Sequence, residues 1–181
     1  MSSDKDIATR GAGDLKERIV SFLTQHTTLS LATSGSGGAP AAAAVFYAHD
    51  ASLRLYFLSE ERTQHGMNLA RNPAVAGTIH ADGQDWREIR GLQVRGVVAP
   101  VPSADLATAA LHYVRKYAFV AALLAGDGGA IALAGPLARA RFYCLRPRWY
   151  RLIDNGVRFG FKEELALPES EDPGMEHDEP T

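Results

Sequence analysis

LSEERTQHGMNLARNP, residues 58–73, is the stretch of this 181-residue sequence that constrains the fold most. The run LRLYFLS just before and into it, residues 53–59, alternates in the manner of a strand. A short helix follows, and Pro73 ends it because the residue before a proline avoids helical geometry. The apolar positions of that helix are Met67, Leu69 and Ala70. The stretch therefore predicts a strand that runs into a polar helix start.

The polar residues at this helix start are of the kinds that bind phosphate. A helix N-terminus presents unpaired backbone N–H groups and the positive end of the helix dipole. Arg62 and His65 add donors that carry or can carry charge, and Thr63 and Gln64 add neutral ones. These residue types alone leave open a solvated helix start that binds no ligand.

Much of the remaining sequence alternates as strands do, with turn residues between the runs. The predicted strands are 28–33, 41–47, 53–59, 74–80, 87–101, 140–153 and 157–165. The Gly-rich segment SGSGGAP, residues 34–40, is followed by a strand and not by a helix, which disfavours a phosphate-binding P-loop and indicates a hairpin. A second hairpin is expected at 154–156. Gly91, Gly96 and Pro147 mark expected bulges or bends.

Helices are predicted at two further places. Residues 14–26 have helical apolar spacing, with Asp14 and Glu17 resembling a capping box. Residues 103–117 form a second amphipathic segment capped by Ser103, FVAALLAG at residues 119–126 continues it as a separate short helix, and GDGG at 126–129 forms a loop. Because successive strands do not alternate with helices, the predicted class is α+β, with a six- to seven-stranded antiparallel barrel or sheet and flanking helices.

The net charge of −2 combines two unlike parts. Residues 168–181 carry six acidic residues and no Lys or Arg, which leaves fifteen acidic against nineteen basic residues elsewhere. Such an acidic tail cannot bury enough apolar surface to order itself, so it is predicted to be disordered. Residues 1–13 are interpreted as a flexible arm and residues 14–167 as one domain. The mildly basic domain suits a small anion and gives no support for nucleic acid as a partner.

Several classes of protein are disfavoured by motifs that the sequence lacks. No apolar run is long enough to span a membrane, and the first residues show no signal-peptide core, so a cytoplasmic location is expected. Cys144 alone can form neither an internal disulfide nor a cysteine-rich zinc site, and is interpreted as a small core residue. Zinc-hydrolase, serine-hydrolase and Rossmann motifs are missing. No metal site is predicted.

The sequence resembles the FMN-binding split-barrel superfamily, which contains pyridoxamine-phosphate oxidase. The resemblance covers about residues 14–162 and rests on the N-terminal helix, on AAAAVFYAHD, on LYFLSEERTQHGMNLARNPAVAGTI and on IRGLQVRGVV. In that family a strand ending in a hydroxyl residue precedes a basic cluster and then Asn-Pro, here Asn72-Pro73. The match is nearest to a branch of small uncharacterised bacterial members. It implies a split β-barrel, bound FMN, and a homodimer with two flavins at the subunit interface.

The resemblance also implies roles for single residues. Leu58 and Ser59 correspond to the strand end, and Ser59, Thr63, Gln64 and His65 would hold the FMN phosphate, with Arg62 beside them. Near the isoalloxazine ring and the partner subunit's flavin, the residues implied are Ala44, Val45, Phe46, Gln93, Trp149 and Lys162.

Two departures from the family's pattern affect the expected activity. Gln64 and His65 stand where the oxidases have two basic residues, so phosphate binding is expected to be weaker and pH-dependent. The C-terminal Arg-x-His of the oxidases is replaced by RFGFKEE, so Arg158 lacks its histidine. Pyridoxamine-phosphate oxidation is therefore not expected.

Three hypotheses remain from the sequence. The chain is an FMN-dependent oxidoreductase of unknown substrate, a non-catalytic protein that binds FMN, haem or a deazaflavin, or a dimeric scaffold whose cofactor site has decayed. Candidate haem ligands are His26, His49, His80 and His112. Simpler structural roles are also open: cross-strand pairing for Gln93, packing for Trp149, ion pairing for Arg90 and Arg95, and solvation for Lys162.

Overall fold

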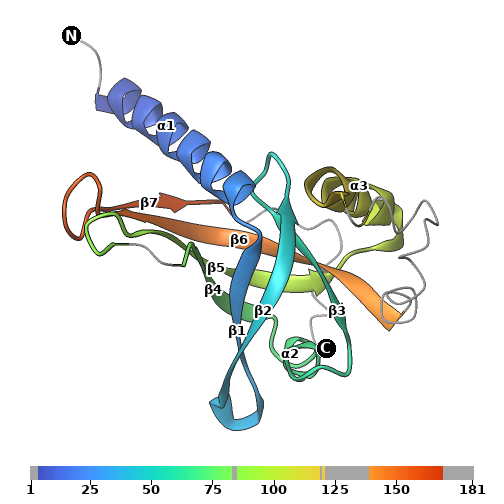
Figure 1. The fold of residues 1–181 in the computed structure, drawn as a ribbon. Coiled ribbons are helices and arrows are strands. Elements are labelled where there is room, and N and C mark those ends of the chain that lie inside the picture. Colours follow the sequence, from blue (N-terminus) through green and yellow to red (C-terminus); the bar gives the residue numbers. More distant parts are fainter. Residues whose placement is uncertain (1–3, 83–84, 119, 121–138, 169–181) are drawn as a thin grey trace, which may run out of the picture.

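The computed structural model describes residues 4–82, 85–118, 120 and 139–168. Seven strands form one antiparallel sheet in the order β3-β2-β1-β4-β5-β6-β7, and a further pairing of β3 with β6 closes the first six into a barrel (Figure 1). The strands are β1 (Thr28–Ser34), β2 (Pro40–His49), β3 (Leu55–Glu60), β4 (Ala74–His80), β5 (Arg90–Pro100), β6 (Ala140–Asp154) and β7 (Lys162–Ala166). This confirms the predicted α+β split barrel.

The helices lie around the barrel and not between its strands. They are α1 (Asp4–Gln25), α2 (Gln64–Leu69) and α3 (Leu106–Lys116), with short 3-10 turns at Ser36–Gly38 and Ser103–Asp105. In Figure 1, α1 and α2 lie at opposite ends of β1 and β2, and α3 lies beside β2 and β3. The barrel thus has one end occupied by α2, where the polar stretch of the sequence is found.

Four predicted boundaries are wrong. The first helix begins at Asp4 and not at Asp14, because Gly11 and Gly13 cost a helix only about 1 kcal/mol each and do not stop it. Ser103 makes no side-chain cap, since a 3-10 turn precedes α3. The long strand expected from residue 87 begins at Arg90, because residues 86–89 form part of the connecting turn.

The last strand begins at Lys162, because the connection after β6 is longer than the predicted 154–156 turn. Asp154 Oδ1 accepts from Gly156 N and Asn155 Oδ1 accepts from Gly160 N, which hold the chain in a wider loop. The predicted short helix at 119–126, apart from Val120, and the loop at 126–129 fall outside the described residues, as does the acidic tail beyond Pro168.

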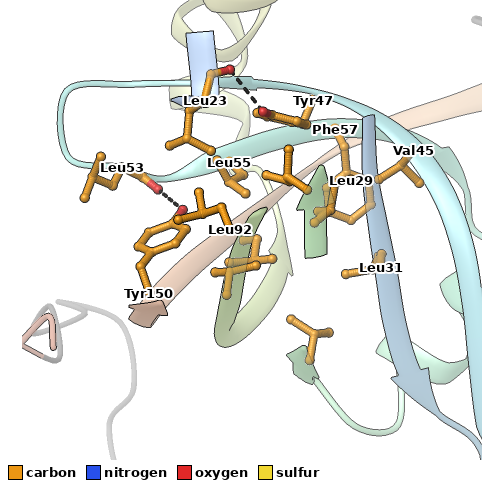
Figure 2. Close-up of a cluster of buried hydrophobic side chains, with 14 of the residues drawn as sticks. Leu23, Leu29, Leu31, Val45, Tyr47, Leu53, Leu55, Phe57, Leu92 and Tyr150 are labelled. Carbon is orange, nitrogen blue, oxygen red and sulfur yellow. Dashed lines mark hydrogen bonds between the residues drawn. The ribbon is translucent and has the colours of Figure 1, made fainter. Parts of the chain in front are cut away.

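The interior of the barrel is apolar and is closed by two buried phenols (Figure 2). Tyr47 donates its hydroxyl to the Leu23 carbonyl at 3.0 Å, which ties β2 to the C-terminal part of α1. Tyr150 donates to the Leu53 carbonyl at 2.8 Å. Each fully buried aliphatic or aromatic side chain contributes about 1.5–3 kcal/mol. The alternation predicted for the strands is therefore what builds the core.

Candidate functional site

The turn between β3 and α2 is held by hydrogen bonds within the chain itself. Thr63 is the N-cap of α2: its hydroxyl accepts from Gly66 N at 3.1 Å and donates to the Glu60 carbonyl at 2.8 Å. A Cβ on Gly66 would lie 2.6 Å from the Glu61 carbonyl oxygen and 2.7 Å from that of Glu60. The close approach of the helix to the turn therefore requires glycine at this position, which the sequence analysis did not single out.

A hydroxyl and an imidazole of the predicted phosphate cluster meet at this turn. Ser59 Oγ lies 2.6 Å from His65 Nε2 and 3.2 Å from Thr63 Oγ1. Ser59 is buried and His65 is half-buried. Burial lowers the pKa of His65 below its ordinary value of 6.5, so the free imidazole is neutral at pH 7. The structure thus brings together three of the residues predicted to bind phosphate.

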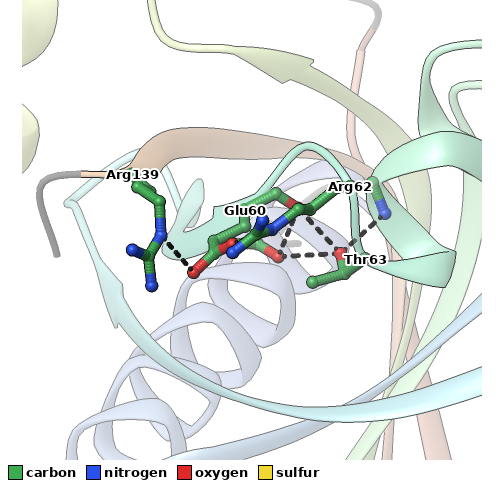
Figure 3. A network of polar contacts seen from close by, with 6 residues as sticks. Glu60, Arg62, Thr63 and Arg139 are labelled. Carbon is green, nitrogen blue, oxygen red and sulfur yellow. Dashed lines mark hydrogen bonds and ion pairs between the residues drawn. The ribbon is translucent and has the colours of Figure 1, made fainter. Parts of the chain in front are cut away.

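The adjacent residues Glu60 and Arg62 form an ion-pair network with Arg139 (Figure 3). Arg62 Nε lies 2.6 Å from Glu60 Oε2, and Arg139 Nε lies 3.4 Å from Glu60 Oε1. Hydrogen bonds from Arg62, and to a smaller extent Arg139, lower the pKa of the Glu60 carboxyl. Arg62, predicted beside the phosphate cluster, is engaged with this carboxylate.

Asn68 is a buried polar residue that the sequence analysis missed. Its side chain is 1% exposed, donates to Thr33 Oγ1 at 3.0 Å and accepts from Gln64 Nε2 at 2.9 Å. Gln64, predicted to hold phosphate, is thus hydrogen-bonded along the helix to Asn68. The available signal in the sequence was the spacing of four residues between Gln64 and Asn68, which lets the two side chains hydrogen-bond on one face of a helix. Its contact fixes α2 against β1.

Most of the residues predicted near the flavin ring lie on the outer face of the sheet. Because successive side chains alternate between faces, the observed register decides which of them meet. One row of paired residues runs across six strands: Ala44, Ser30, Thr78, Gln93, Arg151 and Glu164. The neighbouring row is Ala42, Ala32, Ala76, Arg95, Trp149 and Ala166. One half of this face therefore carries small side chains, and the other carries arginines and Trp149.

The predicted ring contacts do not all share this face. Phe46 is 54% exposed and Lys162 is exposed, and both alternate in step with the rows. Val45 points into the barrel core, and Leu58 packs in the cluster beneath α3. The Val45 side chain therefore faces away from the outer face, whereas Leu58 alternates with the core residues Leu55 and Phe57 and is half-buried.

Trp149 is the centre of a polar group on that face. The guanidinium carbons of Arg95 and Arg151 lie 4.7 and 4.8 Å from its ring centroid, and its Nε1 donates to Glu164 at 3.0 Å. Arg151 Nη1 donates to Gln93 Oε1 at 3.3 Å, so Gln93 makes the cross-strand contact that the sequence left open.

Three further arginines named in the sequence analysis make contacts of their own. The sequence leaves ion pairing open for Arg90 and Arg95. Arg90 forms the expected ion pair, with its Nε 3.1 Å from Asp154 Oδ1. Arg95 stacks on Trp149. Arg158 lies in the loop after β6, with its guanidinium carbon 5.4 Å from the Phe161 ring centroid.

The candidate haem ligands lie in different places. His26 and His80 line one cavity of about 410 Å³ between the end of α1 and strands β1 and β4. His49 contacts Thr24 at 3.0 Å, and His112 stacks on Tyr56.

A metal site and a reactive thiol each place requirements on the described residues. That part of the chain contains no cluster of three or more His, Cys, Asp or Glu placed to hold a metal ion. Burial raises the pKa of the Cys144 thiol to about 11, as befits a core residue. No helix in the described ranges is long and apolar enough to cross a membrane.

The chain is similar in sequence to some known proteins and similar in fold to some solved structures. A UPF0306 protein of Yersinia enterocolitica is 35% identical over 100 residues, which cover 55% of this chain and 67% of that protein. A UPF0306 protein of Klebsiella pneumoniae is 29% identical over 121 residues, covering 65% and 70% of the two chains. These relatives carry no stated activity in their names.

The structural likenesses show the fold. A haem-binding protein from Mycobacterium smegmatis has a TM-score of 0.62 at 19% identity, covering 80% of this chain and 55% of that one. A putative pyridoxamine 5'-phosphate oxidase from Listeria innocua has a TM-score of 0.56 at 19% identity, covering 76% and 97%. HutZ, a haem storage protein from Vibrio cholerae, gives 0.56 at 19% identity, covering 72% and 88%.

The family model for pyridoxamine 5'-phosphate oxidase matches residues 15–153, a range that includes the β3–α2 turn and most of the outer face. With the closed barrel and its added strand, this match places the chain in the pyridoxamine 5'-phosphate oxidase family.

Proposed function

We propose that this protein binds FMN and is a flavin-dependent oxidoreductase of a substrate other than pyridoxamine phosphate. The observation that carries the proposal is the cluster at the β3–α2 turn, where Ser59 Oγ lies 2.6 Å from His65 Nε2. The turn lies within the family-matched residues 15–153. A hydroxyl and an imidazole in contact are the donor types that a phosphate requires.

The residues of the turn fit a phosphate monoester. Ser59 and His65 can each turn a donor toward a phosphate oxygen, and a bound dianion would favour the protonated imidazole, offsetting the burial that keeps it neutral. The hydroxyl of Thr63 already donates its proton to the Glu60 backbone carbonyl. Direct contact of Thr63 with the phosphate therefore stays a prediction. Contact of Gln64 and of Arg62 with the phosphate is likewise a prediction.

The isoalloxazine ring of FMN is proposed to lie on the outer face of the sheet. Ala44, Ala42 and Phe46 are exposed on β2, and the small side chains leave the strand backbone accessible to a planar group. Gln93 lies three strands away, about 14 Å at the usual strand spacing. Bound FMN would supply the electron transfer, while the chain supplies position and hydrogen bonds.

A homodimer is part of this proposal. On the outer face Phe46 is exposed and Trp149 is partly exposed, and a second copy laid on this face would bring Trp149 and Lys162 toward the partner's flavin. The loss of the histidine after Arg158 supports a different substrate from that of the oxidases. The single thiol of the sequence favours the reducing cytoplasm as its location.

The proposal is tested on protein purified without added cofactor. The released ligand is identified by absorbance and mass, which separate FMN, a deazaflavin and haem, and light scattering measures the oligomeric state. The double variant Ser59→Ala, His65→Ala should weaken FMN at least about tenfold and leave riboflavin, which lacks the phosphate, nearly unchanged. Ser21→Ala, an exposed serine of α1, is the control. Equal FMN affinity in the double variant and the wild type would reject the phosphate assignment.

Haem is a second candidate because of the cavity that His26 and His80 share. His26 Nδ1 donates to the Phe22 carbonyl at 2.9 Å, which leaves Nε2 as the atom able to ligate iron. Structurally similar proteins are described as haem-binding and haem storage proteins. Haem is titrated into the wild type and into the double variant His26→Ala, His80→Ala. A shift of the haem Soret band with the wild type that is absent with the double variant would favour haem binding over flavin binding.

A further inference from the structure

The carboxylate of Glu60 lies between two arginines as a bound oxyanion would. Each of its oxygens faces one guanidinium: Oε2 is 2.6 Å from Arg62 Nε, and Oε1 is 3.4 Å from Arg139 Nε. Figure 3 shows the two arginines reaching Glu60 from different parts of the chain. Carboxylates and phosphates accept from guanidinium groups with the same fork-like geometry.

The network is accessible and carries more positive than negative charge. The side chains of Arg62 and Arg139 are 72% and 56% exposed, so a ligand can reach both. Beside them Arg141 Nη1 pairs with Glu61 Oε1 at 2.8 Å. Three guanidinium groups therefore face two carboxylates at this turn, and the excess charge favours one further anion.

The network also adjoins the proposed phosphate cluster. Thr63 Oγ1 donates to the Glu60 carbonyl and lies 3.2 Å from Ser59 Oγ, so the same tight turn carries both groups. Arg62 lies on this turn too, between Ser59 and His65 in the sequence. The pairing of Glu60 with Ala140 between β3 and β6 brings Arg139 to this turn, where Arg62 already lies two residues from Glu60.

We propose that Arg62 and Arg139 form a second anion-binding position, which takes a second phosphate group and which the Glu60 carboxylate occupies in its absence. This inference rests on the proposed flavin site at Ser59 and His65. The second phosphate has two sources: the diphosphate of a flavin dinucleotide, or a phosphorylated substrate bound beside FMN.

The test compares riboflavin, FMN, FAD and inorganic pyrophosphate by calorimetric titration. The proteins are the wild type, Arg139→Gln, Arg62→Gln, Glu60→Gln, and the control Arg115→Gln on an exposed site of α3. If the dinucleotide is the source, Arg139→Gln weakens FAD about tenfold and changes FMN less than about threefold. Arg62→Gln weakens FAD more than FMN, Glu60→Gln tightens FAD, and Arg115→Gln changes neither.

If a phosphorylated substrate is the source, FAD binds more weakly than FMN. The FMN-loaded wild type then binds pyrophosphate, and Arg139→Gln lowers its affinity for pyrophosphate. The inference is overturned if Arg139→Gln changes FAD and FMN equally and leaves pyrophosphate binding unchanged. Failure of the flavin proposal is visible separately, as no binding of FMN by the wild type. Pyrophosphate titration without flavin then decides alone: sensitivity to Arg139→Gln supports the second position, and insensitivity rejects it.

Discussion

Substituting Gly66 by alanine tests the packing that shapes the β3–α2 turn. In an ordinary helix interior this change stabilises by up to about 1 kcal/mol, because alanine has the higher helix propensity. At Gly66 the added Cβ would lie 2.6 and 2.7 Å from two main-chain carbonyl oxygens, whereas ordinary contacts begin at 3.4 Å. The turn or the helix must therefore move by most of an ångström. Main-chain atoms of a hydrogen-bonded turn cannot rotate away as a side chain can.

The expected net cost of Gly66→Ala is about 1–3 kcal/mol, typical of overpacking at a tight contact. The matched control is Gly13→Ala in α1, where a Cβ would find nothing within 4 Å and the propensity gain should appear uncompensated. Urea unfolding followed by circular dichroism measures both. The two variants should change stability in opposite directions. If Gly66→Ala proves as stable as Gly13→Ala, the close approach of α2 to the turn is refuted.

Three further outcomes can be measured by urea unfolding. Asn68→Leu should cost about 1–3 kcal/mol by leaving the Thr33 hydroxyl buried without its donor, and Thr33→Val added to it should restore part of the loss; additive costs would contradict the contact. Burial lowers the pKa of His65 below 6.5, so the unfolded chain takes up the proton first. Stability should therefore fall as the pH drops through and below about 6.5, and His65→Gln should flatten that fall. Burial lowers the pKa of Lys116 from 10.5 to about 8, so stability should rise between about pH 8 and 10.5, and Lys116→Met should remove the rise.

The β3–α2 turn could be predicted from sequence because its determinants are local. The end of a strand, the N-cap Thr63 and the end of the helix ahead of Pro73 all lie within residues 58–73, although α2 already ends at Leu69. The same holds for the strands, whose apolar alternation reports one buried face. Local signals also explain the failure at Asp14, where a plausible cap lies inside a longer helix.

The parts of the candidate site that could not be predicted depend on residues distant in sequence. Asn68 contacts Thr33 across 35 positions, and Glu60 contacts Arg139 across 79. No periodicity reports such pairs, because they follow from which strands become neighbours. The register of the sheet decided likewise that Gln93 meets Arg151.

A bulge in β6 is what places Trp149 on the outer face. Tyr143 and Leu145 point into the barrel core, and so do Tyr150 and Leu152, so the alternation of β6 changes phase between them. The register shift opposite Gly96 supplies the extra residue, and a Cβ at Gly96 would come 2.1 Å from the carbonyl oxygen of the facing strand. Without that extra residue the later half of β6 would reverse its faces.

Gly96 on β5 and Pro147 on β6 therefore have a consequence beyond the two strands that contain them. Gly96 admits the crowded backbone, and Pro147 sits where a ladder hydrogen bond is already disturbed. The phase change lets β6 keep apolar residues in the core on both sides of the bulge and still turn Trp149 toward Arg95. The outer face and the β3–α2 turn are thus specified by different means, one by sheet register and one by local capping. A substitution of Ser59 or His65 at the turn should for that reason leave the outer face intact.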